Sequence, residues 1–226
     1  PFRRAYARVV HEVVARAADD LVFLSEAAAT AFTRYAPGAN YRVVAHGVQM
    51  SDVRTVPDAK ARFGYDDETT LVTQHGFVNP RKGCETFLEL ARYLPDVSFL
   101  LAGGPRTENH RAYYETLVEA APENVQCTDR LDGDDFHAAF AASDLAVLPY
   151  REIFQSGILN WCAGYGLPVV ASDVPYFEEI AREYGAPETF HRTDRGAVVA
   201  TVRRLLYDPE ARAALGDRLH AYAVEN

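Results

Sequence analysis

The sequence predicts an α/β protein built on a parallel, Rossmann-like sheet with helices on both faces. From residue 69 onward, short apolar runs alternate with segments of helical periodicity, a pattern typical of parallel sheets covered by helices. The composition is globular, with 48% hydrophobic and 12% aromatic residues. The 226 residues allow one large domain and part of a second.

Residues 1–47 are predicted to form a separate piece before the main alternation. Its elements are a helix over 3–18, a strand over 21–24, a helix over 26–35 and a strand over 41–44. Ser25 is a favourable N-cap for the second helix, and Pro37 with Gly38 ends it. Because two strands do not form a stable sheet alone, this piece is expected to complete another domain or to dock on the main sheet.

Residues 48–68 are predicted to be a polar linker with a short helix around 57–63, and residues 69–226 to be the main domain. The predicted strands of this domain are 70–75, 97–102, 124–127, 144–149, 168–172 and a short one near 188–191. The predicted helices are 82–94, 109–121, 133–142, 156–165, 175–184, 194–207 and 209–223. Ligands of such sheets bind outside the carboxyl ends of the strands. The chemistry is therefore expected in the loops at 76–83, 103–107, 128–132, 150–157 and 172–176.

Charge and cysteine content argue against several kinds of partner. The formal net charge is −9, and no basic stripe is present that could neutralise nucleic-acid phosphates. No apolar run reaches the ~18 residues of a membrane span, and no signal peptide is recognised, so a cytoplasmic protein or a part of one is expected. Cys84, Cys127 and Cys162 have no CxxC spacing, and neither a disulfide framework nor a metal site is predicted.

The stretch 76-GFVNPRKGCETFLELA is the first candidate ligand-binding motif. Arg81 and Lys82 stand where a helix is predicted to begin, and the N–H groups and dipole of a helix start favour an anion. Cations are unfavourable at that place without an anion, which favours a phosphate site. The alternative is a solvated turn with two surface charges. The motif is not a Walker loop, because GxxxxGK[ST] is absent.

The second candidate motif is Gln155-Ser156-Gly157, which opens a helix after a strand. Gly157 lets a ligand approach its amide closely, and Ser156 can either donate to a ligand oxygen or act as an ordinary N-cap. Both motifs are predicted to lie at the same edge of the sheet, where two positive features facing one cleft suit a diphosphate.

Three other features are interpreted as structural. His75 is expected to make local hydrogen bonds at a strand end rather than to bind a ligand. Gly103-Gly104 is expected to be a tight turn, and Asp173 to cap the helix that follows it.

The order GFVNPRKG, LLAGGP, Arg130-Leu131, ASDLAVLPYREIFQSG and GYGLPVVASD resembles the C-terminal, donor-binding domain of the retaining group 1 glycosyltransferases with the GT-B fold. These enzymes move a sugar from a nucleotide sugar to an acceptor. The segments 19-DDLVFLSEAAATAFTRY and 43-VVAHGV resemble the end of the acceptor-binding, N-terminal domain of the same family. The resemblance thus implies that residues 1–47 end an acceptor domain of which most is missing. The sequence motif PYR…QSG, at residues 149–157, resembles that of one branch of the family.

The resemblance implies how the donor diphosphate is held. The lysine of the family's KG pair contacts the diphosphate and matches Lys82, which is the expected catalytic cation. Amides at the start of the helix after the strand at 144–149 bind the phosphates and match Ser156 and Gly157, with Gln155 beside them. The first glycine of the loop matches Gly76, which is an expected donor-binding residue. In the family an arginine usually follows it; here Phe77 stands in that position, and Arg81 is the expected substitute.

The resemblance also concerns the nucleobase, the ribose and the sugar. The loop after the strand at 124–127 meets the nucleobase through backbone groups and matches Arg130 and Leu131. The family has a spaced pair of glutamates, of which the second binds the ribose and matches Trp161 here. The first matches Ile153, so Glu152 is expected to serve the donor sugar if the loop shifts by one residue. The ribose is left without a clear partner.

The predicted function is therefore metal-independent, retaining transfer of a sugar from a nucleotide diphosphate sugar to an unknown acceptor, with no cofactor. This fragment alone is expected to be inactive without its N-terminal domain, and peripheral membrane association of the full-length enzyme is left open. The alternatives are a catalytically inactive nucleotide-sugar-binding domain and a non-enzymatic interaction module. A sugar-nucleotide epimerase would need catalytic carboxylates and histidines in the cleft, which the sequence does not offer.

Overall fold

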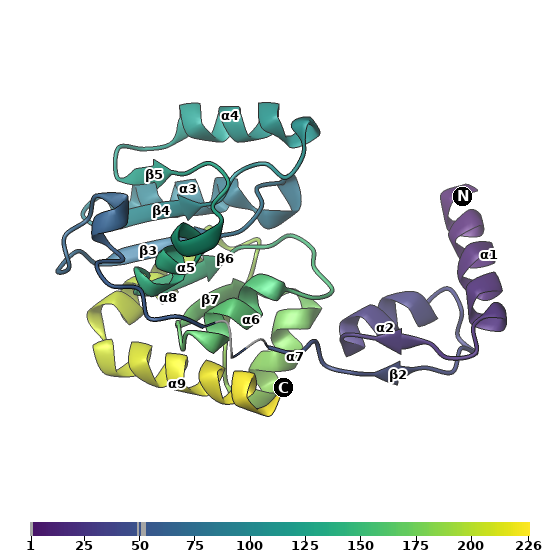
Figure 1. Cartoon of the computed structure of the whole chain (residues 1–226). Helices are drawn as coiled ribbons and strands as arrows, with labels where there is room; N and C mark the ends of the chain where they lie inside the picture. The colour runs from purple at the N-terminus through teal and green to yellow at the C-terminus, as the bar shows by residue number, and fades with distance from the viewer. Residues whose placement is uncertain (1, 49, 51–52) are drawn as a thin grey trace.

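The computed structural model describes residues 2–48, 50 and 53–226. Its main domain contains a parallel sheet of six strands in the order β5-β4-β3-β6-β7-β8 (Figure 1). The strands are β3 Leu71–His75, β4 Ser98–Ala102, β5 Val125–Cys127, β6 Leu145–Leu148, β7 Val169–Ser172 and β8 Glu188–Phe190. Strands β3, β6 and β7 are buried along their whole length, as expected of a parallel sheet with both faces covered. The predicted fold class is confirmed.

The helices of the main domain cover both faces of the sheet. They are α3 Cys84–Tyr93, α4 Arg111–Ala120, α5 Gly133–Ala141, α6 Gly157–Gly164, α7 Pro175–Tyr184, α8 Arg195–Tyr207 and α9 Pro209–Glu225. Helix α3 contacts α4 and α8 and lies behind the sheet in Figure 1, whereas α5 and α6 lie in front of it. None of the helices in the described part of the chain is long and apolar enough to span a membrane.

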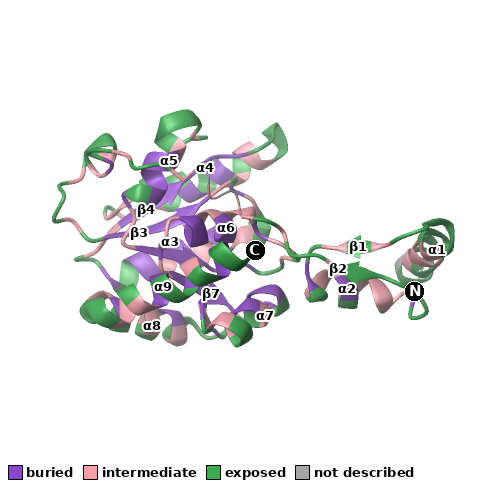
Figure 2. Cartoon of the chain, turned by 60° about the horizontal axis from the view of Figure 1, so that its bottom comes forward, coloured by how far each residue is buried: buried purple, intermediate pink, exposed green. Residues whose placement is uncertain are grey.

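Side chains that alternate along the strands divide the core between the two faces. Leu71, Leu100 and Ala102 pack in one cluster with alanines of α5. Val72 and Phe99, one position along, belong to the larger cluster that includes α3 and α8. The purple interior of Figure 2 follows the strands of this sheet. This two-residue alternation along the strands thus sets which helix each side chain meets.

The second half of the predicted linker packs on the main sheet. Val56, Ala59, Phe63 and Tyr65 join the cluster on the α5 face, and the Tyr65 hydroxyl donates to the Phe99 carbonyl at 3.2 Å. The short helix expected around 57–63 is a turn followed by a 3-10 helix, η2 Ala61–Phe63. These residues therefore fold as part of the larger domain.

The N-terminal segment does not extend the main sheet. Its elements are α1 Phe2–Ala17, β1 Val22–Phe23, α2 Glu26–Thr33 and β2 Arg42–Val43, and β1 and β2 pair only with each other. Ser25 caps α2 as predicted, since its hydroxyl accepts the Ala28 N–H at 3.0 Å, and it also donates to the Phe154 carbonyl at 2.6 Å. The carboxylate of Glu179 on α7 accepts the first two N–H groups of α2, each at 3.1 Å. The segment thus docks on α7 and the loop before α6.

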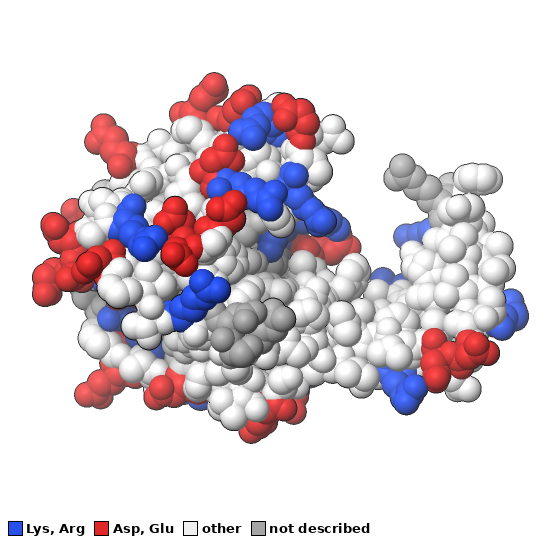
Figure 3. All heavy atoms as spheres, in the orientation of Figure 1, with Lys and Arg blue, Asp and Glu red and all other residues white. Residues whose placement is uncertain are grey.

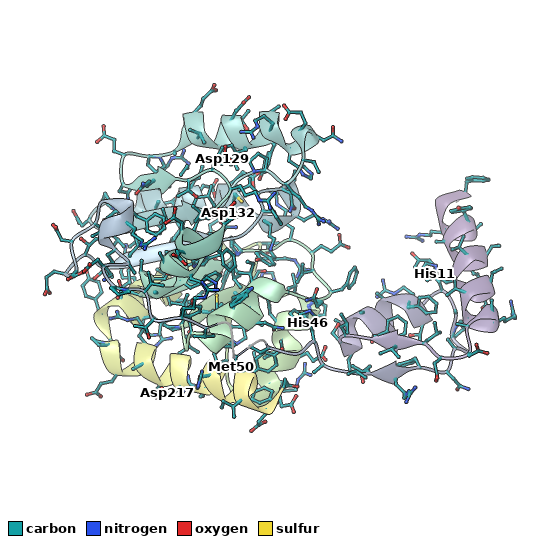
Figure 4. The ribbon with its side chains drawn as sticks, viewed as in Figure 1. His11, His46, Met50, Asp129, Asp132 and Asp217 are labelled. Atoms are coloured by element: carbon teal, nitrogen blue, oxygen red, sulfur yellow. The ribbon has the colours of Figure 1, made fainter. Side chains whose placement is uncertain are left out.

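The chain crosses between the two parts at His46, which Figure 4 labels beside α6. The Asn160 amide donates to the His46 and Gly47 carbonyls at 3.0 and 3.3 Å and contacts the His46 ring at 2.6 Å. Its oxygen accepts the Tyr222 hydroxyl of α9 at 3.1 Å. Asn160 is 4% exposed, so a buried amide ties the crossing to α6 and α9.

Candidate functional site

The loops at the carboxyl ends of β3, β4 and β5 meet closely enough that only glycine fits at two positions. A Cβ on Gly103 would lie 2.3 Å from the Gly76 carbonyl oxygen, and one on Gly104 would lie 2.3 Å from the Asp129 carboxylate. Gly103 also has a φ of +146°, which other residues rarely adopt. The predicted tight turn at Gly103-Gly104 is therefore a close approach of three loops.

These loops enclose a cavity of about 610 Å³. It is lined by residues from the ends of β3 and β4, from the loop after β5 and from α5 and α6. They are His75, Gly76, Phe77, Asn79, Arg81, Lys82, Ala102, Gly103, Gly104, Arg106, Thr107, His110, Arg130, Leu131, Phe136, Ala139 and Ile158. The sequence-predicted residues Gly76, Arg81, Lys82, Arg130 and Leu131 are thus brought together in one place.

The sequence predicted that Arg81 and Lys82 stand at the start of a long helix. The structure instead places them in the short 3-10 helix η3 Pro80–Lys82. The Asn79 side chain caps η3 by accepting the Arg81 N–H at 3.0 Å, and Gly83 leaves it with a left-handed φ of +65°. Helix α3 starts only at Cys84. The asparagine cap and the glycine therefore form a tight turn in front of α3, which is called the basic turn (residues 80–83).

Lys82 is held against Tyr150, a fully buried residue at the end of β6. Its ammonium donates to the Tyr150 hydroxyl at 2.5 Å and lies 3.9 Å from the centre of the ring. Burial lowers the pKa of Lys82 to about 8. At neutral pH the side chain is therefore a poorly hydrated cation in the cavity wall, a state that a bound anion stabilises.

The cavity is cationic although the protein is acidic. Arg81, Lys82, Arg106 and Arg130 line it, and no Asp or Glu stands among its described lining residues, against a net charge of −9 for the chain. The guanidinium groups of Arg106 and Arg130 lie 5.6 and 5.7 Å from the centre of the Phe77 ring. Figure 3 shows Lys and Arg side chains gathered on the side of the large domain that faces the N-terminal segment.

The loop after β5 is shaped by Asp129. One carboxylate oxygen of Asp129 accepts the Arg130 N–H at 2.7 Å, and the other lies 3.3 Å from the Arg111 guanidinium. The Arg130 N–H, followed by Arg111, holds the pKa of Asp129 below its usual value. The carboxylate is therefore occupied by its own loop and by Arg111, and Leu131 and Phe136 contribute apolar side chains to the cavity lining.

The start of α6 is divided between two hollows. Ser156 is 2% exposed, and its hydroxyl accepts the Leu159 N–H at 3.2 Å. Of the two roles open from the sequence, donor to a ligand oxygen or ordinary N-cap, the structure shows the N-cap. Ile158 lines the main cavity. Gly157 lines a neighbouring hollow of about 330 Å³ with His46 and Trp161, and Gln155 lines neither of them.

Glu152 is exposed and lines a smaller hollow of about 140 Å³. This hollow shares Asn79, Arg81 and Lys82 with the main cavity, so Glu152 lies on the other side of the basic turn. Trp161 turns towards α5, where its ring meets Phe136 edge-on at 5.4 Å. The residue that the resemblance aligns with a ribose-binding glutamate therefore contributes to an aromatic cluster in this protein.

His75 behaves as the local hydrogen-bonding residue that the sequence predicts. Its Nε2 atom lies 2.8 Å from the Thr73 hydroxyl and 3.3 Å from the Ser143 hydroxyl, and its ring stacks on Phe140 at 4.1 Å. Burial lowers the pKa of His75 to about 3. The ring is thus neutral in the folded protein at any ordinary pH.

Acid is expected to destabilise the protein through His75. The unfolded chain binds a proton at the ordinary pKa of histidine and the folded chain does not, so stability is lost as pH falls from the unfolded pKa towards the folded one. From about pH 7 to about pH 5 this loss is about 2 kcal/mol. Urea unfolding at both pH values measures it, and the His75→Asn variant is expected to lack this component. An unchanged pH dependence in the variant would contradict the assignment.

Several lining residues were missed by sequence reasoning. Arg106 and His110 follow the Gly-Gly-Pro turn, and Phe136 lies in the first turns of α5. The signal for Arg106 was available, because a basic residue directly after a strand-end glycine turn lies at the ligand-binding edge. Phe136 carried no such signal, because helical apolar residues most often belong to the core.

The prediction that Asp173 caps α7 was wrong. Val174 occupies the cap position, and the Asp173 carboxylate accepts the Arg192 N–H at 3.0 Å and also lies 3.3 Å from its guanidinium. Pro175 at the first helical position has no N–H to be capped. Asp173 therefore ties the loop after β7 to the loop after β8.

The chain is similar in sequence to enzymes that transfer sugars. The family model described as "Glycosyl transferases group 1" matches residues 56–220. The GDP-mannose-dependent alpha-(1-6)-phosphatidylinositol monomannoside mannosyltransferase of Mycolicibacterium smegmatis is 28% identical over 251 residues, covering 97% of this chain and 61% of that protein. The alpha-galactosylglucosyldiacylglycerol synthase of Streptococcus pneumoniae is 30% identical over 122 residues, covering 52% of this chain and 32% of that protein. The chain thus spans one to two thirds of the length of these relatives.

Solved structures support the same fold. Anabaena HepE in complex with UDP-glucose superposes with a TM-score of 0.83 at 18% identity, covering 98% of this chain and 63% of that one. The C-terminal domain of a group 1 family protein from Francisella tularensis has a TM-score of 0.64 at 15% identity, covering 80% of this chain and 98% of that domain. At such identities the likeness concerns the fold.

Proposed function

The chain belongs to the group 1 glycosyltransferase family, and on that premise we propose that its cationic cavity binds the diphosphate of a nucleotide sugar. One observation carries the proposal. Four cations from three loops line one cavity at the carboxyl edge of a parallel sheet, with no carboxylate among the described lining residues. An anion with several oxygens is the ligand that this arrangement suits.

The parts of the donor follow from the chemistry of the lining. The diphosphate lies against Lys82 and Arg81, with the N–H groups at the start of α6 facing it. The nucleobase lies towards Leu131 and Phe136, between backbone groups of the loops after β4 and β5. The sugar lies beyond the basic turn, towards the hollow that Glu152 lines.

The proposed reaction is transfer of the sugar to an acceptor with retention of configuration and without a metal. The leaving diphosphate gains negative charge in the transition state, and Lys82 lies where it can stabilise that charge. The M. smegmatis relative is named for its use of GDP-mannose and HepE was solved with UDP-glucose, which supports a nucleotide sugar as the donor. The acceptor, glycan, lipid or small molecule, is bound with a complete N-terminal domain, so the isolated chain is inactive in transfer.

A second candidate is a catalytically inactive nucleotide-sugar-binding domain, and Trp161 favours it. A tryptophan cannot accept hydrogen bonds from the ribose as a glutamate does. A donor-hydrolysis and transfer assay in a protein that carries both domains separates the two candidates, because only the first predicts turnover above the uncatalysed rate.

We also propose that the protein is cytoplasmic and that the full-length enzyme associates peripherally with a membrane. Two relatives are named for lipid acceptors, which supports work at a membrane surface. Co-sedimentation of the protein with anionic lipid vesicles measures this association.

Titration calorimetry with UDP, GDP, ADP and dTDP tests the proposed ligand. One of these nucleotides is expected to bind with micromolar affinity, and the matching monophosphate roughly tenfold or more weakly, because it offers one phosphate fewer to the cations. An interaction module, the remaining alternative, predicts no heat with any of them. That result would exclude the proposed function.

A further inference from the structure

Three consecutive residues at the end of β6 contact three consecutive residues of the basic turn. The Arg151 N–H donates to the Arg81 carbonyl at 2.8 Å, and the Tyr150 hydroxyl accepts from the Lys82 ammonium at 2.5 Å. The Pro149 carbonyl lies so close to Gly83 that a Cβ there would be 1.9 Å from its oxygen. The segment 149–151 therefore holds the turn 81–83 at every one of its positions.

A side-chain ion pair extends this contact into helix α3. The Arg151 guanidinium lies 3.0 Å from the Glu85 carboxylate in the first turn of that helix. The Gln74 amide of β3 donates to the Lys82 carbonyl at 2.9 Å. The backbone of the basic turn is thus fixed by hydrogen bonds to β3 and to the end of β6.

Tyr150 is a rigid partner for one of those side chains. It is 0% exposed, its carbonyl accepts the Ser172 hydroxyl at 2.5 Å, and its ring packs on Phe177 at 5.4 Å. Burial raises the pKa of Tyr150, so the phenol stays neutral and keeps its oxygen as an acceptor. Neither the ring nor the hydroxyl can move without disturbing the core.

We propose that Tyr150 is a positioning residue that holds the Lys82 ammonium at the cavity wall, with the ring beneath it and the hydroxyl beside it. The inference rests on the proposed function, since the ammonium is positioned for the donor diphosphate. Lysine loses about as much rotamer entropy as any side chain when it is ordered. With the ammonium already seated on Tyr150, part of that cost is met before the ligand arrives, which is the advantage of preorganisation.

We expect the Tyr150 hydroxyl also to favour the charged form of Lys82. An oxygen that accepts a hydrogen bond from an ammonium favours its protonated form, and it acts here against the burial that lowers the pKa of Lys82 to about 8. Removing the hydroxyl therefore lowers the Lys82 pKa further. Binding of a diphosphate then weakens, and the pH above which it is lost moves down.

The Tyr150→Phe variant tests the inference, with inorganic diphosphate as the calorimetric probe. The ring remains and the hydroxyl is lost, so the affinity at about pH 7.5 is expected to fall roughly five- to tenfold. The Tyr222→Phe variant is the matched control, because it removes another tyrosine hydroxyl, the one bonded to Asn160, without touching the cavity. Its affinity is expected to equal that of the wild type.

NMR of the lysine side chains measures the Lys82 titration directly, which would not change in Tyr150→Phe if Tyr150 only stabilised the fold. The chain has only two lysines, Lys60 and Lys82, so protein labelled at the lysine ε-methylene shows two signals, which Lys82→Ala assigns. In the wild type the Lys82 signal is expected to titrate at lower pH than that of a solvated lysine, because the ammonium is buried against Tyr150. In Tyr150→Phe the Lys82 signal is expected to titrate at lower pH, whereas Lys60 stays unchanged.

The outcomes separate this inference from the proposed function. The positioning role is wrong if three results are found together. The wild type binds diphosphate, Lys82→Ala weakens this binding, and Tyr150→Phe equals the wild type both in affinity and in the titration of the Lys82 signal. A Lys82 signal that titrates in the wild type at the pKa of a solvated lysine overturns it too, even if Tyr150→Phe does not fold. If the wild type does not bind diphosphate at all, the proposed function fails instead.

Discussion

Replacing Lys82 with alanine is expected to lower the turnover of a two-domain protein by ~100-fold or more, because one donor aimed at a developing oxyanion is typically worth ~3 kcal/mol. The ammonium is the cation of the cavity that is both seated on a buried partner and poorly hydrated. Its loss therefore removes charge stabilisation that water replaces badly. Steady-state kinetics with the nucleotide sugar identified by calorimetry measures the effect.

Lys60→Ala is the control for this prediction. Lys60 is the other lysine of the chain, and its ammonium pairs with Asp144 at 3.0 Å and donates to the Thr69 carbonyl at 2.7 Å, before β3 begins. Its loss is expected to reduce stability and to leave turnover within roughly twofold. Near-normal turnover of Lys82→Ala would remove Lys82 from the catalytic role.

Replacing Gly83 with alanine is expected to lower the free energy of unfolding by about 3 kcal/mol or more. Its φ of +65° is unfavourable for alanine, and the added Cβ would lie 1.9 Å from the Pro149 carbonyl oxygen. Either the basic turn or the end of β6 must move, so binding of a nucleoside diphosphate is expected to be lost as well. Thermal unfolding measures the first effect as a fall in Tm of roughly 6–12 °C.

Gly64→Ala separates the close approach from the backbone strain. Gly64 has a similar φ of +79°, but no atom lies within 4 Å of the Cβ that alanine would add. Its cost is therefore the conformational part alone, about 1 kcal/mol. Equal losses in the two variants would show that the contact between Gly83 and Pro149 contributes nothing.

Most of the fold was predictable because local signals and tertiary packing agree. Helix α7 was predicted with the bounds that the structure has, since Pro175 and Gly185 mark both of its ends. The six strands were found because their apolar runs are short and separated by turn residues. Each strand end was predicted within one residue of its place in the structure. Flanking residues such as Asn124 and Pro168 still accept a backbone hydrogen bond from the neighbouring strand, although they lie outside the strands.

The site was predictable at the level of loops and less so at the level of side chains. Arg81 and Lys82 were placed at the right edge, but the 3-10 turn that carries them depends on the Asn79 cap and on Gly83. The contact between Tyr150 and Lys82 joins residues far apart in sequence, and no local pattern reports such a pair. The resemblance to the family identified the cation, and the structure shows what holds it.

The N-terminal segment illustrates a different limit. Its elements were predicted, but the apolar side of α1 does not pack in a core among the described residues: Phe2, Tyr6, Val9 and Val13 are all more than half exposed. Figure 2 shows this helix largely in the colour of exposed residues. Periodicity reveals that a helix has an apolar face, but not what covers that face.

A crystal structure of the protein with the nucleoside diphosphate selected by calorimetry tests the central claim most directly. The diphosphate is predicted to lie within hydrogen-bond distance of the Lys82 ammonium and to face the first N–H groups of α6, with the base against the loop after β5. A nucleotide bound elsewhere on the protein, or bound with its phosphates turned away from Lys82 and Arg81, would contradict the account.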